Sequence, residues 1–376
     1  MNKVLVIGSH PKSLIQFRGE LLHSFRKSGC KVIACASGEC TETINNLSIM
    51  GIDYIPAPIN RTSINPLHDL ILLFQLMLII RRVKPDCVLT YTVKPVIYGM
   101  LAARISGIQQ RYAMITGLGY AFISSHSFGK KILKLTVSFL YKLSLAKAKA
   151  VFFQNNDDLN LFRNKKIIGE KSHALRVMGS GVDIEHFKFT QIPSGKLVFL
   201  LIARLLNDKG IREYVEAARI VKEKRPNDEV NFFLLGSFDS NPAAIQPSVI
   251  EQWVSDGFIK YLGSTDDVRS YIEQCSVFVL PSYREGMPRS VLEAMSMGRA
   301  IITTDAPGCR DTVVNNENGY LVPVKSIKEL SIAMLKLIDN RQAIRKMGIK
   351  SRKLAEESFD VSKVNKVILE EMGIYG

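Results

Sequence analysis

The feature that most constrains this fold is a structural plan that the sequence runs through twice. Short apolar runs alternate with segments of helical pattern, beginning at Lys3–Ile7 and again at Leu197–Ile202. Strands that alternate with helices form parallel sheets covered by helices on both faces. A segment containing proline, glycine and serine, TQIPSGK at 190–196, separates the two copies. The sequence therefore predicts an α/β protein of two doubly wound, Rossmann-like domains that face each other across a cleft.

The apolar runs also predict where the elements lie. The expected domains are 1–190 and 191–360, with a C-terminal helix at 361–376 that packs back on the first domain. The expected strands of the first domain are 3–7, 31–36, 87–90, 111–115 and 151–154, and the expected first helix is 14–28. The expected strands of the second domain are 197–202, 230–235, 259–262, 277–280 and 300–303, and its first helix is expected at 210–224.

Charge is distributed unevenly between the two halves. The chain of 376 residues has a net charge of +15. Residues 1–190 hold 25 basic and 11 acidic side chains, whereas residues 191–376 hold 25 and 24. The segment 87–156 contains nine basic residues and no acidic one. This asymmetry predicts that the first half faces an anionic partner.

Two segments bear on membrane contact. The stretch 70–80, LILLFQLMLII, is shorter than the roughly 20 apolar residues of a spanning helix, so we expect a buried helix there. The segment 129–150 carries six lysines and no acid, with apolar residues at helical spacing. It is either an ordinary helix with a solvated basic face or a surface that meets anionic lipid. The chain opens on an apolar strand without the charged region of a signal peptide, and its six cysteines include no C-x-x-C pair, so we expect a cytoplasmic protein.

Charged residues follow two strands of the second half. Arg204 and Lys209 come after the strand at 197–202, and the Lys-Gly pair at 209–210 precedes a helix whose first N–H groups favour negative charge. Glu285 follows the strand at 277–280, and Pro288 is expected at the first position of the next helix, which contains Glu293. Two acids beside a helix N-terminus suit a polyol bound next to a phosphate.

The spacing of these acids carries a family resemblance. Glu285 and Glu293 are spaced as in the E-x-seven-E motif of retaining glycosyltransferases, and with Arg204 and Lys209 the chain resembles family 4 glycosyltransferases of the GT-B fold. The resemblance extends over essentially the whole chain. The first half is similar to enzymes that extend bacterial capsular, O-antigen and lipid-linked glycan precursors.

The resemblance implies roles for the donor site. Arg204 and Lys209 would neutralise the donor diphosphate as it leaves, Glu285 would hold hydroxyls of the transferred sugar, and Glu293 would bind the ribose. The remaining donor-binding positions act through their backbone beside the sugar, phosphates and base: Gly286, Met287, Pro288, Gly263 and Gly236.

The acceptor positions implied by the resemblance lie in the basic half: Lys12, Arg18, Lys94, Gly117 and Gly119. The sequence departs from the family pattern here. His10-Pro11-Lys12-Ser13 stands where many members have a Gly-Gly pair, and 115–120 reads ITGLGY where many have a histidine. No residue is therefore assigned to catalysis in this half.

The sequence contains no Asp-x-Asp motif. Cations and a helix N-terminus can stabilise a leaving diphosphate without a metal, so we expect a metal-independent enzyme without cofactors. The predicted reaction is hexosyl transfer with retention from a nucleotide sugar, expected to be UDP-linked, to an undecaprenyl-diphosphate-linked saccharide in bacterial surface polysaccharide synthesis. The enzyme is expected on the inner face of the cytoplasmic membrane as a peripheral protein, with an anionic membrane surface as partner and no nucleic acid. The alternatives are a nucleotide-sugar epimerase of the same architecture and a non-catalytic module that binds anionic membrane or nucleic acid.

Overall fold

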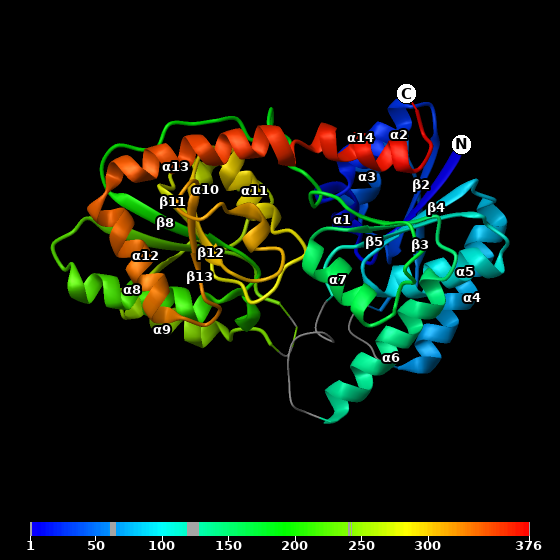
Figure 1. Cartoon of the computed structure of the whole chain (residues 1–376), viewed down its shortest axis with the longest axis horizontal. Helices are drawn as coiled ribbons and strands as arrows, with labels where there is room; N and C mark the ends of the chain where they lie inside the picture. The colour runs from blue at the N-terminus through cyan, green and yellow to red at the C-terminus, as the bar shows by residue number, and fades with distance from the viewer. Residues whose placement is uncertain (1, 61–64, 119–127, 240, 242, 376) are drawn as a thin grey trace. The chain divides into compact units, whose positions relative to one another are not determined.

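A computed structural model describes residues 2–60, 65–118, 128–239, 241 and 243–375. It divides into two compact units (Figure 1): unit 1 is Met1–Ser180 with Ser362–Gly376, and unit 2 is Gly181–Val361. The division falls at Gly181 and not within the 190–196 segment, because Val182 forms a β-bridge with Asp360 that ties this part of the chain to unit 2. The prediction of two doubly wound parallel sheets is confirmed.

Unit 1 is built on a parallel sheet of seven strands in the order β3-β2-β1-β4-β5-β6-β7. The strands are β1 (Lys3–Ile7), β2 (Lys31–Ser37), β3 (Asp53–Ala57), β4 (Cys87–Tyr91), β5 (Gln110–Ile115), β6 (Ala150–Phe153) and β7 (Ala174–Arg176). Alternate residues of β1 enter different cores, because side chains of a strand point to opposite faces. Val4 and Val6 pack in one cluster, and Leu5 and Ile7 in another.

Helices cover both faces of this sheet (Figure 1). On the Val4 face lie α1 (Pro11–Gln16), α2 (Gly19–Lys27), α3 (Thr41–Ile49) and the C-terminal α14 (Val361–Glu371). On the Leu5 face lie α4 (Pro66–Val83), the π-helical turn η1 (Pro95–Gly99), α5 (Met100–Ile105), α6 (Phe128–Leu145) and α7 (Asn156–Asn164). The single helix expected at 14–28 is wrong, since the chain breaks at Phe17 and Arg18 between α1 and α2.

Unit 2 repeats the plan with six parallel strands in the order β10-β9-β8-β11-β12-β13. The strands are β8 (Leu197–Ile202), β9 (Val230–Leu235), β10 (Lys260–Tyr261), β11 (Val277–Leu280), β12 (Ala300–Thr304) and β13 (Gly319–Val322). The helices are η3 (Asn207–Lys209), α8 (Ile211–Lys224), α9 (Pro247–Ser255), α10 (Arg269–Glu273), α11 (Arg289–Ser296), η4 (Arg310–Thr312), α12 (Ile327–Asp339), α13 (Arg341–Leu354) and η5 (Ala355–Phe359).

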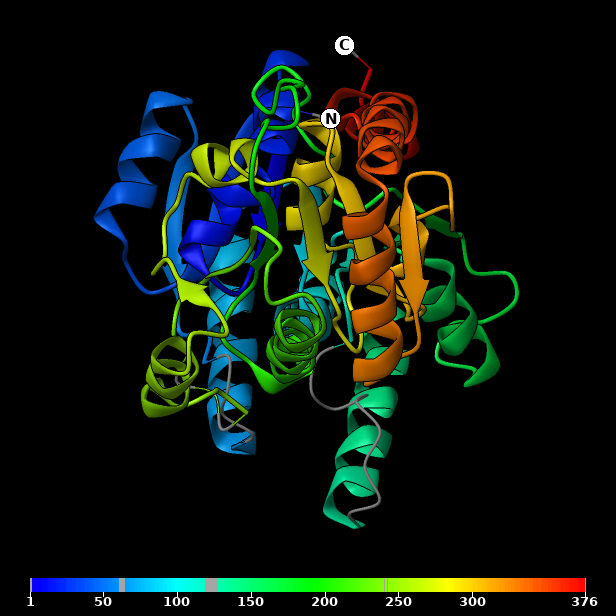
Figure 2. The same cartoon turned by 90° about the vertical axis from the view of Figure 1, so that its left-hand side faces the viewer.

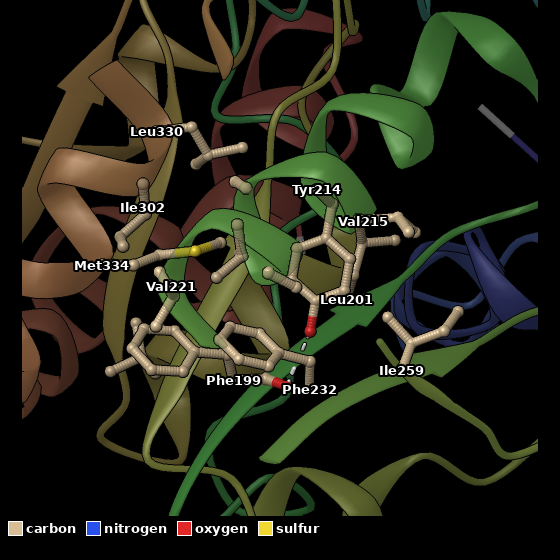
Figure 3. Packing of buried hydrophobic residues seen from close by; sticks show 14 of the residues in the cluster. Phe199, Leu201, Tyr214, Val215, Val221, Phe232, Ile259, Ile302, Leu330 and Met334 are labelled. Atoms are coloured by element: carbon tan, nitrogen blue, oxygen red, sulfur yellow. Dashed lines mark hydrogen bonds between the residues drawn. The ribbon is translucent and has the colours of Figure 1, made fainter. Parts of the chain in front are cut away.

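Aromatic side chains fill one core of unit 2 (Figure 3). The rings of Phe199 and Phe232 stack with centroids 5.3 Å apart, and Tyr214 lies edge-on to Phe232. The buried hydroxyl of Tyr214 donates a hydrogen bond of 2.8 Å to the carbonyl of Phe199. This bond satisfies a polar group that would otherwise be costly to bury.

Both sheets share the topology that creates a ligand crevice. β1 pairs with β2 on one side and β4 on the other, and β8 pairs with β9 and β11 in the same way. The chain therefore builds each sheet outward first on one side of the central strand, β1 or β8, and then on its other side. In open parallel sheets, ligands bind outside the carboxyl ends of the strands at such a switch point. Each unit thus has one edge where functional side chains are expected.

Candidate active site

The carboxyl edge of unit 2 is formed by loops that interlock through their backbones. The N–H of Tyr283, after β11, donates to the carbonyl of Asp208 at 2.9 Å, and the N–H of Glu285 donates to the carbonyl of Pro307, after β12, at 3.0 Å. These bonds link the loops that follow β8, β11 and β12. The predicted residues on the loops are therefore held by backbone contacts that span three strands.

Glycine is required where these loops touch. Gly210 has φ +71°, and a Cβ atom there would lie 2.1 Å from the carbonyl oxygen of Pro281. Gly308 has φ +77°, and its Cβ atom would lie 2.5 Å from the carbonyl oxygen of Glu285. Only glycine adopts this backbone conformation readily and leaves room for such an approach. Gly308 thus positions Glu285, a role that its place in the sequence does not reveal.

Two predicted catalytic residues meet at this edge. The Nζ of Lys209 lies 2.5 Å from Oε1 of Glu285, and their side chains are only 14% and 16% exposed. Lys209 ends the short helix η3 after β8, whereas Glu285 lies in the loop after β11. The two strands are neighbours in the sheet, which brings together residues 76 positions apart in the chain. A cation and a carboxylate are therefore held side by side in a largely desolvated place.

Arg204, the other predicted catalytic cation, has a different partner. Its Nη1 donates to Oδ2 of Asp239 at 2.7 Å, and the Arg204 side chain is half-exposed. Asp239 follows β9 and also accepts a hydrogen bond from the N–H of Asn241. Asp239 was not predicted, because nothing in its local sequence indicates a contact with a residue 35 positions earlier.

Glu293 lies inside α11 and is 9% exposed. Burial raises the pKa of its carboxyl, although Nε of Arg289, 2.8 Å from Oε1, acts in the opposite direction. The negative charge of Asp267, in the segment after Gly263, raises the pKa of Glu293 further. Pro288 occupies the N-cap of α11 and not the expected first helical position, which is Arg289.

The glycines expected near the donor also lie at this edge. The N–H of Gly236 donates to the carbonyl of Gly263 at 2.8 Å, so the ends of β9 and β10 are joined. A Cβ atom on Gly236 would lie 1.8 Å from the carbonyl oxygen of Ala203, whereas one on Gly263 would meet nothing within 4 Å. Gly286 and Met287 are buried between Glu285 and the start of α11.

The carboxyl edge of unit 1 centres on Tyr91, at the end of β4. A Cβ atom on Gly8, at the end of β1, would lie 2.2 Å from the Tyr91 ring, so this close approach requires glycine. The hydroxyls of Tyr91 and Ser13 lie 2.9 Å apart, and burial raises the pKa of Tyr91 to about 12. The buried guanidinium of Arg18 lies 5.3 Å from the centre of the same ring. Arg18 is thus built into the switch point of this sheet.

Lys94 is also engaged with other protein groups at this edge. Its Nζ lies 2.6 Å from Oδ1 of Asp69 on α4, and the hydroxyl of Tyr98 donates to the other carboxylate oxygen at 2.8 Å. Between Tyr91 and Lys94, Thr92 has φ +69°. A β-branched residue is strained in this conformation, and such strain is concentrated at functional edges.

The other predicted acceptor residues are less informative. Lys12 pairs with Glu42 at 3.3 Å on the surface. Gly117 follows β5 and has φ +115°, which favours glycine. Gly119 lies outside the described residues, as does Tyr120 of the segment 115–120, where many family members have a histidine. A cavity of about 530 Å³ lies between the ends of β2 and β3 and the first turns of α4, but none of the predicted acceptor residues lines it.

The described residues form neither a metal-binding cluster nor a membrane-spanning helix. No group of three or more His, Cys, Asp and Glu side chains in the described ranges is placed to hold a metal ion. None of the helices formed by those residues is long and apolar enough to cross a membrane.

The chain is similar to known glycosyltransferases over most of its length. Residues 196–340 match the family described as glycosyl transferases group 1, and residues 3–155 match the family described as glycosyl transferase 4-like. The chain is 29% identical over 345 residues, 88% of each chain, to N,N'-diacetylbacillosaminyl-diphospho-undecaprenol alpha-1,3-N-acetylgalactosaminyltransferase of Campylobacter jejuni. It is 25% identical over 294 residues, 74% of this chain and 73% of the relative, to UDP-Gal:alpha-D-GlcNAc-diphosphoundecaprenol alpha-1,3-galactosyltransferase of Escherichia coli.

The fold is also found among solved structures. Anabaena HepE in complex with UDP matches with a TM-score of 0.75 at 17% identity, and the match covers 99% of each chain. The expected resemblance to family 4 glycosyltransferases is confirmed, and so is the expected similarity to enzymes that extend lipid-linked glycan precursors.

Proposed function

The chain belongs to the glycosyltransferases, group 1 in its second half and 4-like in its first, and we propose that it moves one hexose or N-acetylhexosamine from a nucleotide sugar to a polyprenyl-diphosphate-linked saccharide. We take the donor to be UDP-linked and the acceptor lipid to be undecaprenyl diphosphate. The named relatives from Campylobacter jejuni and Escherichia coli, which act on such acceptors, support this choice. The product would enter a bacterial surface polysaccharide or glycan.

The observation that carries the proposal is the Lys209–Glu285 pair. A donor nucleotide sugar presents a diphosphate next to a ring of hydroxyl groups, and so requires a cation and a hydrogen-bond acceptor side by side. Lys209 and Glu285 provide these groups 2.5 Å apart at the switch point of unit 2. Their low exposure strengthens electrostatic interactions with a bound anion.

In the proposed reaction, an acceptor hydroxyl forms a bond to the anomeric carbon of the donor sugar and passes its proton to an oxygen of the departing diphosphate. The bond from that carbon to the diphosphate breaks, and the nucleoside diphosphate leaves with the bonding electrons. Lys209 and Arg204 would stabilise the negative charge on the leaving group, Glu285 would hold sugar hydroxyls, and Glu293 would accept hydrogen bonds from the ribose. We propose retention of the anomeric configuration, no metal requirement and no cofactor.

Arg204 must exchange partners to take this role. Its guanidinium is paired with Asp239, and a diphosphate would replace that carboxylate. The Arg204 side chain is 49% exposed and that of Asp239 is 21% exposed, and pairs open to solvent contribute only about 0–1 kcal/mol, so the exchange costs little. The Arg204–Asp239 pair would hold the guanidinium at the edge until the donor arrives.

The acceptor would bind in unit 1, whose sequence carries most of the positive charge. A lipid-linked substrate stays in the bilayer, so the enzyme has to reach the cytoplasmic membrane surface as a peripheral protein. The lysines of 130–149 support this part of the proposal, since each lysine near an anionic surface contributes about 1 kcal/mol. Vesicle sedimentation tests it. A variant with Lys130, Lys131 and Lys134 changed to Glu should bind anionic vesicles more weakly than the wild type, and equal binding would contradict the proposal.

The reaction itself is tested with a panel of nucleotide sugars. The purified chain is incubated with each donor and with undecaprenyl-diphosphate-linked saccharides, and the lipid fraction is analysed by mass spectrometry. The proposal predicts a lipid product heavier by one sugar with at least one donor. A parallel incubation omits the acceptor. Conversion of the nucleotide sugar there, with no lipid product in any full reaction, would instead indicate an epimerase.

A further inference from the structure

Helix α4 exposes an apolar stripe that its sequence did not predict. The 70–80 stretch was expected to be buried, but only Leu72, Leu76 and Ile80 are fully buried, while Leu73, Met77 and Ile79 pack against the core and are partly buried. The outward face of α4 carries five large apolar side chains that are 43% to 67% exposed: Leu67, Leu70, Ile71, Phe74 and Leu78. Their spacing places them on one side of the helix. A contiguous apolar surface of this kind marks an interaction site.

A second apolar stripe lies on α6, in the same helical layer. Ile132, Leu135, Phe139 and Leu143 are 41% to 70% exposed. Both α4 and α6 pack against α5 and η1, so the two helices flank the same central element. Each begins at the carboxyl edge, because it follows a parallel strand. Figure 2 shows the N-terminal turns of α4 and α6 projecting on the same side of unit 1.

The charges around these stripes identify the partner. The only acid of α4, Asp69, is paired with Lys94, and the helix ends in the exposed residues Arg81 and Arg82. Helix α6 contains no acid, and its exposed Lys131 and Lys142 flank the apolar residues. Apolar stripes with basic neighbours, and with the one acid of α4 paired, suit the interface of an anionic bilayer, where apolar side chains enter the acyl boundary and cations contact headgroups.

The α4 stripe also adjoins the acceptor edge. Asp69, between Leu67 and Leu70, holds Lys94 at the end of β4. Ile71 lines the cavity at the ends of β2 and β3. The diphosphate of a polyprenyl lipid lies at headgroup level, so the surface that meets the bilayer has to adjoin the edge that binds this group. The first turns of α4 meet that requirement.

We propose that the outward face of α4, from Leu67 to Leu78, inserts into the interface of an anionic bilayer and supplies the apolar part of membrane binding. The lysines of α6 supply the electrostatic part. This inference rests on the proposed function for its acceptor, but it assigns a separate element. It predicts that a fraction of the binding persists at high salt, because apolar insertion is not screened.

The test uses the full chain and vesicles of phosphatidylcholine with phosphatidylglycerol, without donor or acceptor. Leu70→Ser combined with Phe74→Ser removes two exposed side chains and should weaken binding on the order of tenfold. It should also abolish the binding that the wild type retains at about 1 M salt. The matched control is Ile49→Ser, which removes an 85% exposed apolar residue from α3 on the other face of the sheet and should change nothing.

A tryptophan placed in the α4 stripe reports on membrane insertion without the serine substitutions. The chain has one tryptophan, Trp253, in unit 2. Phe74→Trp in a Trp253→Phe background should give an emission that shifts to the blue when vesicles are added. The inference is overturned if the double variant binds like Ile49→Ser and the new tryptophan emission does not shift. It is also overturned if sedimentation velocity shows that the stripe joins two copies of the chain.

Failure of this inference differs from failure of the proposed function. Sugar transfer to a detergent-solubilised acceptor by a chain whose α4 stripe does not contact vesicles would reject the inference alone. Vesicle binding through α4 by a chain that transfers no sugar would reject the proposed function alone.

Discussion

Breaking the Lys209–Glu285 pair should cost unit 2 a measurable part of its stability. The substitution Lys209→Met removes the cation but keeps most of the side-chain volume. It leaves the Glu285 carboxylate in a place where its side chain is 16% exposed. Removing one partner of a fully buried pair costs about 3–5 kcal/mol, and exposed pairs contribute about 0–1 kcal/mol. For this largely buried pair we expect a loss of about 2 kcal/mol.

A double-mutant cycle isolates the interaction from other effects of each substitution. Glu285→Gln removes the carboxylate charge, and the double variant leaves neither charge behind. We expect the double variant to be less destabilised than the sum of the single variants, with a coupling of about 1–2 kcal/mol. Urea unfolding followed by Trp253 fluorescence measures this, since the only tryptophan lies in unit 2.

The control is an exposed pair in the same unit. Lys196 lies 3.2 Å from Glu229, and both side chains are more than half exposed. Lys196→Met should therefore change the unfolding free energy by less than about 1 kcal/mol. Lys209→Met should also lower turnover tenfold or more, because it removes charge stabilisation of the leaving diphosphate, whereas Lys196→Met should not. Additive single-variant effects, or equal losses for the two lysines, would show that Lys209 and Glu285 do not stabilise each other.

Three further predictions concern the donor edge. Glu293→Gln should raise the donor KM more than it lowers kcat. Burial raises the pKa of Glu293 in the folded chain above its ordinary value of 4.5, so ionisation of this carboxyl opposes folding as pH rises above 4.5. The wild type should therefore lose stability relative to Glu293→Gln over that range. The same pH dependence of stability in both proteins would contradict the burial of an ionisable Glu293. Asp239→Asn should tighten UDP binding a few-fold in calorimetry by releasing Arg204, and Arg204→Ala should weaken it; unchanged affinity in both would remove Arg204 from the site. Excess EDTA should leave the transfer rate unchanged, and loss of activity that magnesium or manganese restores would show that a metal is required.

The central strands could be predicted from the sequence because parallel strands buried on both faces appear as continuous apolar runs. β1, β8, β9 and β11 have the predicted bounds. Edge strands carry a weaker signal. β3 contains Asp53 and Pro56, and β7 has three residues, none of them buried, so neither was predicted.

The donor residues could be predicted because each follows a strand at a characteristic spacing. Their partners could not, since Asp239 and Gly308 meet Arg204 and Glu285 only through the topology of the sheet. The outward face of α4 was missed for another reason. A helix that is apolar all round is normally buried, and composition does not show which of its faces the fold leaves uncovered.

The proposed sugar transfer is tested most directly by its initial rate to a polyprenyl-diphosphate-linked saccharide in the wild type, Glu285→Gln and the control Glu229→Gln. Mass spectrometry of the lipid product gives the rate, and calorimetry gives the affinity for UDP. We expect Glu285→Gln to slow transfer on the order of a hundredfold with little change in UDP affinity, whereas Glu229→Gln should transfer like the wild type. Equal rates for the two variants, or an unchanged acceptor with every nucleotide sugar, would contradict this expectation.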